Sequence, residues 1–478
     1  MSHAPASPRT QRLRPSVLII VQNLPVPLDR RVWLECQALA AQGYTVSVIC
    51  PKGPHDPARQ TIDGIAIYKY LPPPAATGAV GFALEFAYCW VRTALLSIRV
   101  RRERGFDVIQ ACNPPDTFWA LARLWKRRGV SFVFDHHDLN PELYLSRFGR
   151  PSSMVARAQL RALLWLERRT FRTADHVIST NASYRAIAVR RGGMRPDAVT
   201  VVRSGPDTRS MRPVYPASDI RRHAGPVLVY LGIMGPQDGV DQVLTLVHEL
   251  VNVRGRLDLR AVIMGFGDCL ESLREQCTAA GLDPYVTFTG RVGPETIAEY
   301  LSAADIGLGP DLNTPLNDLS TMNKTMEYMA FALPSVSFDL TETRQSGGDA
   351  AVYVPSGDIG AFADEVESLL DDPVKRAALG RAARARAEQV LDWQAQAKEY
   401  VGVFSRVLHR PAGTARTGEW PFSAPERSAP DHSAPDHPGG VSRVVDLADE
   451  AAFTRFLVTR GRPGHGARGR LTTTTVLE

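Results

Sequence analysis

Short apolar runs alternate with helical stretches along most of the chain, and the runs fall into two sets. The first set is residues 17–21, 45–50, 66–70, 107–111, 131–135, 176–180 and 199–203, and the second is 227–232, 260–265, 286–290, 306–310, 335–339 and 351–354. Runs of this kind separated by helices predict parallel strands that are buried on both faces. The two sets therefore predict an α/β fold of two doubly wound, Rossmann-like domains, joined near Pro206 to Pro226. A ligand is expected in the cleft between them, outside the carboxyl ends of the strands.

The same pattern divides the chain into five parts. They are a flexible N-terminus (1–14), a first domain (15–210), a second domain (226–390), a last helix (391–408) and a disordered tail (413–478). The tail repeats SAPD and is rich in proline, so it cannot bury enough apolar surface to order itself. Within it, residues 441–458 have the pattern of a marginal helix, to which no function is assigned.

Composition agrees with this organisation and narrows the class of protein. With 478 residues, of which 44% are hydrophobic and 22% charged, the chain is long enough for two globular domains. The net charge of +6 is small, but basic residues crowd the first half, which favours an anionic membrane surface as partner over nucleic acid. Six cysteines without metal-ligand spacing predict reduced core thiols and no metal site. The first residues carry no apolar signal core, so a cytoplasmic protein is expected.

Residues 78–105 form a long apolar stretch with a basic end. Phe82, Phe86, Trp90 and Leu95 give it the composition of a helix that lies in a membrane interface. A helix that covers a sheet is the alternative. Together with the basic first half, the stretch predicts peripheral contact with the inner face of the plasma membrane, as a lipid-linked acceptor would require.

The most informative segment is TMNKTMEYMAFALP, from Thr321 to Pro334. It places one lysine and one glutamate at the start of a helix that is otherwise apolar. Unpaired N–H groups at a helix start carry partial positive charge, so Asn323 and Lys324 are predicted to hold phosphate, while Glu327 accepts hydrogen bonds from sugar hydroxyls. A lysine–glutamate pair that merely decorates a helix surface is the alternative.

This segment resembles the C-terminal domain of family 4 glycosyltransferases, which are retaining enzymes of the GT-B fold, and the resemblance covers roughly residues 15 to 408. It implies that Glu327 binds the ribose of a nucleoside diphosphate sugar, that no cofactor or metal is needed, and that the helix after Trp393 crosses back to the first domain. The loop NLPVPLDRR, in place of the glycine pair of many relatives, resembles a subgroup associated with bacterial surface polysaccharides.

In the first domain, two clusters of polar residues follow strands. Asp29 is predicted to cap a helix whose first turn holds Arg30 and Arg31, where the helix dipole disfavours cations. These three residues suggest an acceptor contact, with an Asp–Arg pair that fixes the loop as the alternative. By resemblance, His137 of HDLNPE is the histidine that contacts the donor sugar, whereas its neighbour His136 is expected to be structural.

Glu142, in the same HDLNPE segment, could bind the acceptor or serve as a carboxylate at a helix start.

In the second domain, the glycine-rich loops match the nucleotide pocket of the family. Gly232 and Gly235 would let the backbone approach a diphosphate, and Gly265, Gly267 and Gly290 fit positions near the base, although all of them could be plain turn residues.

This chain departs from the family pattern at two places. Ile233 and Asp238 stand where many relatives have an arginine and a lysine, so Lys324 or else Arg344 is expected to supply the positive charge. Leu319 stands where relatives have a first glutamate, and the sequence leaves open whether Asp318 or Asp311 replaces it.

The sequence thus predicts an enzyme that transfers a sugar from a nucleoside diphosphate donor to a glycan or lipid-linked hydroxyl, with His137, Lys324 and Glu327 as its central residues. A catalytically silent GT-B scaffold that binds nucleotide sugar, and a sugar-nucleotide epimerase, are the alternatives. The first would bind without turnover, and the second would isomerise its donor without an acceptor.

Overall fold

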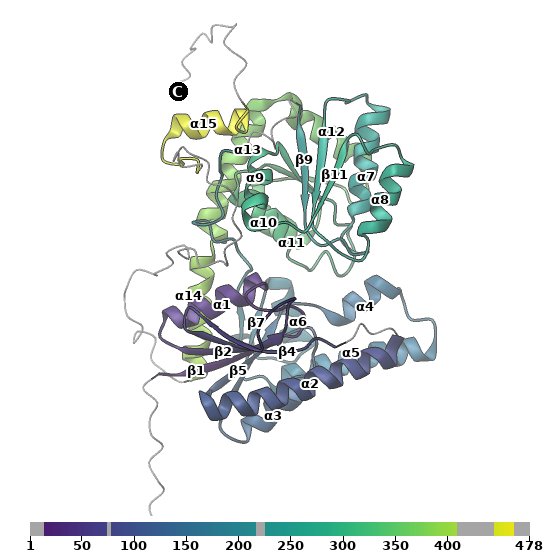
Figure 1. Ribbon diagram of the computed structural model, residues 1–478. Helices are drawn as coiled ribbons and strands as arrows, with labels where there is room; N and C mark the ends of the chain where they lie inside the picture. Colours follow the sequence, from purple (N-terminus) through teal and green to yellow (C-terminus); the bar gives the residue numbers. More distant parts are fainter. Residues whose placement is uncertain (1–13, 74–77, 217–224, 409–443, 463–478) are drawn as a thin grey trace, which may run out of the picture. The chain divides into compact units, whose positions relative to one another are not determined.

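The computed structural model describes residues 14–73, 78–216, 225–408 and 444–462. The chain divides into two compact units: the N-terminal unit, residues 1–204 and 393–429, and the C-terminal unit, residues 205–392 and 430–478. Each unit contains one sheet with helices on both of its faces (Figure 1). The predicted α/β fold with two Rossmann-like domains is therefore confirmed.

The sheet of the N-terminal unit has eight strands in the order β3-β4-β2-β1-β5-β6-β7-β8. They are β1 (Ser16–Ile20), β2 (Thr45–Pro51), β3 (Arg59–Ile62), β4 (Ile65–Tyr70), β5 (Val108–Cys112), β6 (Ser131–His136), β7 (His176–Ser179) and β8 (Val199–Val201). All neighbours are parallel except β3, which pairs antiparallel with β4. The sequence pattern missed β3 because this short edge strand buries no continuous apolar run.

Two apolar layers cover the faces of this sheet. Val17 and Ile19 of β1 pack with α1 (Arg30–Ala41) and α14 (Trp393–Val407), whereas Leu18 and Ile20 face the opposite layer. The opposite layer includes α2 (Gly78–Glu103), α3 (Trp119–Lys126), α5 (Met154–Thr173) and α6 (Ala182–Arg190). A short helix, α4 (Asn140–Phe148), packs on α5, and Pro196–Ala198 form one turn of 3₁₀ helix. Alternate residues of a strand point to opposite faces, so both faces of the sheet are apolar.

The sheet of the C-terminal unit has six parallel strands in the order β11-β10-β9-β12-β13-β14. They are β9 (Val227–Leu231), β10 (Arg260–Met264), β11 (Val286–Gly290), β12 (Ile306–Gly309), β13 (Ser335–Phe338) and β14 (Val352–Val354). The winding direction reverses between β9 and β12, and open α/β sheets bind ligands outside the carboxyl ends of the strands at such a point.

Helices also cover both faces of the second sheet. One layer contains α7 (Val240–His248), α8 (Leu270–Ala279) and α12 (Ile359–Asp371), and the other contains α9 (Pro294–Ala303) and α10 (Asn323–Ala330). The remaining helices are α11 (Thr341–Gly347), α13 (Pro373–Arg386), a 3₁₀ turn (Gly348–Ala350) and two π-helical turns (Glu249–Val253 and Ala387–Leu391).

A C-terminal strap, residues 444–462, packs on the C-terminal unit and contains α15 (Glu450–Thr459). Val444 forms a bridge with Val214, and Phe453, Phe456 and Leu457 are buried beside Ala332. The predicted disorder of 413–478 is therefore wrong over the strap, because a helix that looks marginal alone gains an apolar surface to bury against. The rest of that tail, and the predicted flexible residues 1–13, lie outside the described residues.

Candidate functional site

A cavity of about 410 Å³ lies at the carboxyl edge of the C-terminal sheet. The loops after β9, β10 and β11 and the first turn of α10 form its walls. The lining residues are Leu231, Gly232, Ile233, Asp238, Gly265, Phe266, Arg291, Val292, Ile297, Thr321, Met322, Asn323, Lys324 and Glu327. We call this feature the C-terminal cavity. It lies beside the point where the strand order reverses, as expected for a ligand site in such a sheet.

Two of the predicted glycines, Gly232 and Gly265, line the cavity at a place where two backbone segments touch. Gly265 has φ +145°, and a Cβ built there would lie 1.7 Å from the carbonyl oxygen of Gly232. No other residue type fits Gly265, because a side chain would collide with backbone rather than with a movable group. The wall of the cavity is therefore bare backbone, which a phosphate can approach closely.

The other three predicted glycines are not among the lining residues, but they lie in the same loops. A Cβ on Gly267 would lie 2.6 Å from the carbonyl oxygen of Met234, so this glycine also permits a close backbone contact. Gly235 donates its N–H to the carboxylate of Asp238 at 2.8 Å. The carbonyl oxygen of Gly290 accepts a hydrogen bond from Gly265.

The start of α10 opens into the cavity. Met322 precedes the helix, and its side chain cannot cap the first N–H groups. Asn323, at the first helical position, is exposed, and Glu327, one turn later, is half-buried. The structure therefore brings Asn323, Lys324 and Glu327 together on one wall, with the positive end of the helix dipole beside them.

Lys324 is not an isolated cation. Its Nζ donates to both carboxylate oxygens of Asp311, at 2.6 and 2.7 Å, and lies 5.2 Å from the ring centre of Tyr230. Both charged side chains are almost fully buried. Much of the charge of Lys324 is therefore balanced by Asp311, whose role as a replacement for the missing first glutamate remains a prediction.

Arg291 also lines the cavity, and the sequence pattern did not single it out. Its guanidinium stacks over Phe266, 5.1 Å from the ring centre, in the loop that follows β11. In the part of the chain that the structure describes, no carboxylate forms an ion pair with it. Arg291 is thus a cation at the cavity with charge to offer an anionic ligand.

In the N-terminal unit, Arg31 is the centre of a buried polar network. Its guanidinium lies 3.0 Å from carboxylate oxygens of Asp135 and of Glu35, and its Nε lies 2.9 Å from Nε2 of His137. Further bonds run to Val202 and Ser204. We define the Arg31 network as Arg31, Glu35, Gln110, Asp135 and His137.

The pKa values of the two carboxyl groups of this network are shifted in opposite directions. Burial, and then the charge of Asp135, raise the pKa of Glu35 well above its ordinary value. Burial also acts to raise the pKa of Asp135, but the charges of Arg31 and His137 outweigh it and lower that pKa. The pKa values of these two neighbouring carboxyl groups are therefore shifted in opposite directions, and Arg31 balances the charge of Asp135. The amide of Gln110 donates to both, at 2.7 and 2.9 Å.

The adjacent histidines have different surroundings, as predicted. The Nε2 atom of His137 lies 2.7 Å from Asp135. His136 is fully buried among Phe134, Phe171 and Tyr184, and burial lowers its pKa to about 3. His136 is therefore a neutral core residue, whereas His137 remains at the edge of the sheet with a partly exposed ring.

Two family models match this chain, one in each unit. The model described as "Glycosyl transferase 4-like domain" matches residues 28–205, and the model described as "Glycosyl transferases group 1" matches residues 225–372. Together they cover most of both sheets and include both groups of residues described above. The chain belongs to glycosyltransferase family 4.

Relatives in this family are distant in sequence. The alpha-D-kanosaminyltransferase of Streptomyces kanamyceticus is 25% identical over 337 residues, which is 66% of this chain and 83% of the relative. The sucrose-phosphate synthase of Thermosynechococcus elongatus has the same fold, with a TM-score of 0.67 at 18% identity over 83% of this chain and all of that one. Anabaena HepE in complex with UDP-glucose aligns with a TM-score of 0.62 at 16% identity, over 82% of this chain and 99% of that one. This chain is accordingly a glycosyltransferase of the hexosyltransferase class with the GT-B fold.

The residues predicted to bind the acceptor of this family 4 enzyme have other partners in the structure. Asp29 caps α1 by accepting from the N–H of Val32 at 3.1 Å, as predicted. Arg31 is tied to Asp135 rather than to Asp29, so neither an open acceptor contact nor the predicted Asp–Arg loop pair describes it. Arg30 lies next to it and is half-buried.

Glu142 forms a two-point ion pair with Arg191, which also binds Glu167 at 2.6 Å. The carboxylate at the start of α4 thus joins two helices of the N-terminal unit.

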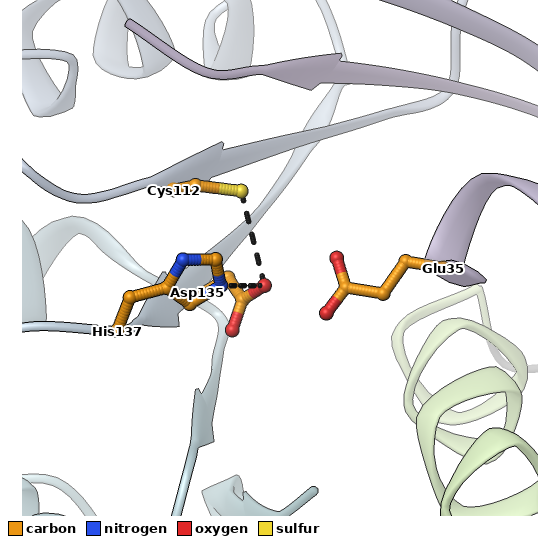
Figure 2. Close-up of side chains that lie close together, drawn as sticks. All are labelled: Glu35, Cys112, Asp135 and His137. Carbon is orange, nitrogen blue, oxygen red and sulfur yellow. Dashed lines mark hydrogen bonds and ion pairs between the residues drawn. The ribbon is translucent and has the colours of Figure 1, made fainter. Parts of the chain in front are cut away.

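Four side chains of the N-terminal unit have the arrangement of a metal site. Figure 2 shows Glu35, Cys112, Asp135 and His137, whose potential ligand atoms all lie within 4.8 Å of one another. However, Arg31 bonds to three of the four, so its guanidinium already supplies the cation. These contacts fit a network centred on a guanidinium.

Two residues suggested for the donor site of the enzyme lie outside the cavity. Arg344 pairs with Asp339 at 2.6 Å and stacks on Tyr353, on the exposed side of α11. Asp318 accepts hydrogen bonds from the backbone and hydroxyl of Thr341, at 2.8 and 3.0 Å, and so caps α11. Neither lines the C-terminal cavity.

The sequence pattern missed Arg291 and the buried pair Glu35–Asp135. For Glu35 and Asp135 a signal was present, since each is a lone carboxylate inside an apolar run, VWLECQAL and SFVFD. For Arg291 there was none, because one arginine in a loop carries no pattern.

Proposed function

We propose that this enzyme transfers a hexosyl group from a nucleoside diphosphate sugar to a hydroxyl of a glycan or lipid-linked acceptor, with retention of the anomeric configuration. The proposed setting is the synthesis of a cell-surface polysaccharide or glycolipid, at the inner face of the plasma membrane. The observation that carries the proposal is the C-terminal cavity, in which the start of α10, a bare backbone wall and Glu327 meet. The fold shared with HepE, which was solved with UDP-glucose, supports the choice of donor.

In this proposal, the diphosphate of the donor lies against the first turn of α10 and the backbone of Gly232. The helix dipole and the N–H groups stabilise the negative charge that develops as the phosphate departs. Arg291 adds a cation, which compensates for Ile233 and Asp238 at positions where relatives carry basic residues. Because Lys324 is paired with Asp311, it acts chiefly by holding the start of α10 beside the wall.

Glu327 binds the ribose hydroxyls in this proposal. Of the cavity-lining residues only Glu327 and Asp238 are carboxylates, and Asp238 holds the N–H of Gly235. No pair of carboxylates is thus arranged as acid and nucleophile. The resemblance instead implies attack on the same face of the sugar, with the departing phosphate accepting the proton of the incoming hydroxyl. This reaction uses neither a cofactor nor a metal.

His137 is proposed to contact the sugar. If its Nε2–H donates to Asp135, its other ring nitrogen can accept a hydrogen bond from a sugar hydroxyl. Arg31 lies 3.0 Å from the same carboxylate, so it would hold Asp135, and through Asp135 the orientation of His137, rather than contact the acceptor directly.

The test compares Glu327→Ala with Glu275→Ala, an exposed carboxylate of α8 outside the cavity. Loss of charged hydrogen bonds to ribose should lower donor affinity and kcat/KM about 10- to 100-fold. Calorimetry with UDP-, GDP- and ADP-sugars first identifies the donor, and mass spectrometry then follows transfer. Glu275→Ala should behave as wild type, and unchanged affinity in Glu327→Ala would remove the site from the proposal.

A scaffold that binds nucleotide sugar without turnover is the second candidate. Ile233 and Asp238 in the cavity favour it, because they remove charge that a leaving diphosphate needs. Donor binding by calorimetry with neither hydrolysis nor transfer, over a panel of acceptors, would support the scaffold instead.

A further inference from the structure

Helix α2 of the N-terminal unit is apolar on two faces: one packs on the core through residues such as Cys89 and Val100, and the other carries large apolar side chains that face outward. Leu84, Tyr88, Val91, Leu95 and Ile98 are all exposed, with 67% of Leu84 and 57% of Leu95 accessible. Their spacing of three and four residues places them along one face of the helix. This outward stripe spans about 21 Å at 1.5 Å per residue.

The buried face of the same helix is mixed, so it does not account for the outward stripe. Thr93 and Ser97 are completely buried there, and Ser97 accepts a hydrogen bond from the indole N–H of Trp125 at 3.1 Å. In an ordinary surface helix the apolar side chains cover the core and the polar ones meet water. A helix that carries a second apolar stripe on its outer face departs from this order, and such surfaces mark interaction sites. The sequence pattern of α2 had pointed to Phe86 and Trp90, but these two are half-buried.

The layer around α2 is strongly basic. Arginine and lysine number four on α2, two on α3 and five on α5, eleven in all, against two carboxylates on α2 and one on α5. Of the three carboxylates, Glu103 pairs with Arg99 and Glu167 is buried against Arg191. The three helices lie in one layer (Figure 1). Ser97 of α2 accepts a hydrogen bond from Trp125 of α3, and Trp119 of α3 contacts Trp165 of α5.

We infer that the face formed by α2, α3 and α5 docks on an anionic lipid surface, with the stripe of α2 inserted among the lipids and the arginines at the headgroups. An apolar stripe flanked by cations is the pattern that binds such interfaces. Trp165, half exposed with Arg169 stacked on its ring, has the amphipathic character of residues at a bilayer boundary.

Other occupants fit this face less well. A second copy of the chain would bring one basic face against another, and like charges would repel. Nucleic acid would satisfy the arginines but would leave the aliphatic stripe of α2 in water. No helix among the described residues is long and apolar enough to pass through a bilayer, so contact by this face would be peripheral.

The inference rests on the membrane contact in the proposed function and adds which helices make that contact. It is tested without measuring sugar transfer, so the inference and the proposed function can fail separately. Full-length protein is mixed with vesicles of phosphatidylcholine, with or without roughly one-third phosphatidylglycerol, and sedimented. Binding is expected only with the anionic vesicles, and it should weaken at about 0.5 M salt. Equal binding to neutral vesicles, or none to anionic ones, would overturn the inference.

Variants locate the contact. The triple change Leu84→Ser, Val91→Ser and Leu95→Ser should reduce vesicle binding at least about tenfold while leaving donor affinity unchanged. Its matched control, Leu257→Ser with Val374→Ser, removes equally exposed apolar side chains from the C-terminal unit and should bind vesicles as wild type does. A loss of binding in both would contradict the assignment to α2.

Charge is tested separately by Arg92→Gln, Arg102→Gln and Arg161→Gln, all exposed. These changes should lower the affinity for anionic vesicles and flatten its salt dependence. Sedimentation velocity without lipid tests whether a second copy of the chain binds this face. A dimer that depends on Leu84, Val91 and Leu95 would assign the face to a second copy instead.

Discussion

At the scale of single residues, the structure separates charges that hold the fold from charges that face a ligand. Lys324 and Asp311 bury their charges against each other, as do Arg31 and Asp135, whereas Arg291 and Glu327 line the C-terminal cavity. In sequence these groups look alike, because each is a charged residue with apolar residues close by. The sequence could therefore predict the start of α10 and the glycines as a site, but not which cation is already neutralised, since that depends on a partner distant along the chain.

The pairing of Lys324 with Asp311 can be measured in a double-mutant cycle. Lys324→Met alone and Asp311→Asn alone should each cost about 3 kcal/mol of unfolding free energy, because each leaves a buried group unpaired. The double variant should lose clearly less than the sum of the two, by circular dichroism in urea. Donor affinity should be lower than that of the wild type in all three variants, because the start of α10 is no longer held. Additive losses would mean that the two side chains do not interact.

His136 predicts how the N-terminal unit responds to acid. Its pKa is lowered to about 3 in the folded chain, against about 6.5 when unfolded. As the pH falls below 6.5, His136 is therefore protonated in the unfolded chain but not in the folded chain, and the free energy of unfolding decreases. His136→Phe removes this effect. Between about pH 7.5 and 5, the wild type should lose about 2 kcal/mol more than the variant.

Tryptophan fluorescence in urea is the suitable measurement, because all six tryptophans among the described residues lie in the N-terminal unit. His55→Asn, at an exposed position with φ +64° that asparagine tolerates, is the control and should retain the pH dependence of the wild type. Parallel losses of stability in His136→Phe and wild type would contradict this role of His136.

At the scale of elements, α10 is held at both ends by different means. Its first turn opens into the cavity, while the carbonyl groups at its far end accept hydrogen bonds from buried arginines. Arg384 donates to Ala330, and Arg460 of the strap donates to Phe331 and Ala332. Cations at the carboxyl end of a helix oppose the negative end of its dipole.

Arg460→Met should therefore destabilise the C-terminal unit by about 2–4 kcal/mol, because two buried carbonyls lose a charged donor. Arg455→Met, on the exposed side of α15, should be nearly neutral and is the control. Thermal unfolding by circular dichroism measures both variants. Equal effects of the two substitutions would show that the strap contributes only general packing.

The strap also shows which kind of element could not be predicted from the sequence. Strand runs such as 227–231 were predicted to within a residue or two, because a short, continuous apolar stretch between two helices is typical of a strand buried on both faces. The helix at 450–459 could not be judged in the same way, since Phe453 and Phe456 become stabilising only against Ala332 and Tyr215. Packing of that kind is a property of the folded unit, not of the segment.

At the scale of the whole molecule, the two units should respond differently to nucleotide. The cavity is lined wholly by the C-terminal unit, so UDP at about 100 times its Kd should stabilise that unit by about 2.7 kcal/mol. The transition seen by circular dichroism should move, whereas the tryptophan transition of the N-terminal unit should not. A tryptophan transition that moves by the same amount would mean that the nucleotide binds elsewhere or that the units unfold together.

Both units are completed by segments that follow their sheets in the chain. The sheet of the N-terminal unit ends at residue 201, yet Trp393 and Tyr400 of α14 fill its core. The C-terminal unit likewise closes only when Arg460 reaches α10. A polypeptide stalled before α14 would expose apolar surface on its first sheet, and one released before the strap would lack the last support of its donor helix. Competence for transfer would thus require synthesis of the chain through Arg460, because only then is the carboxyl end of α10 held.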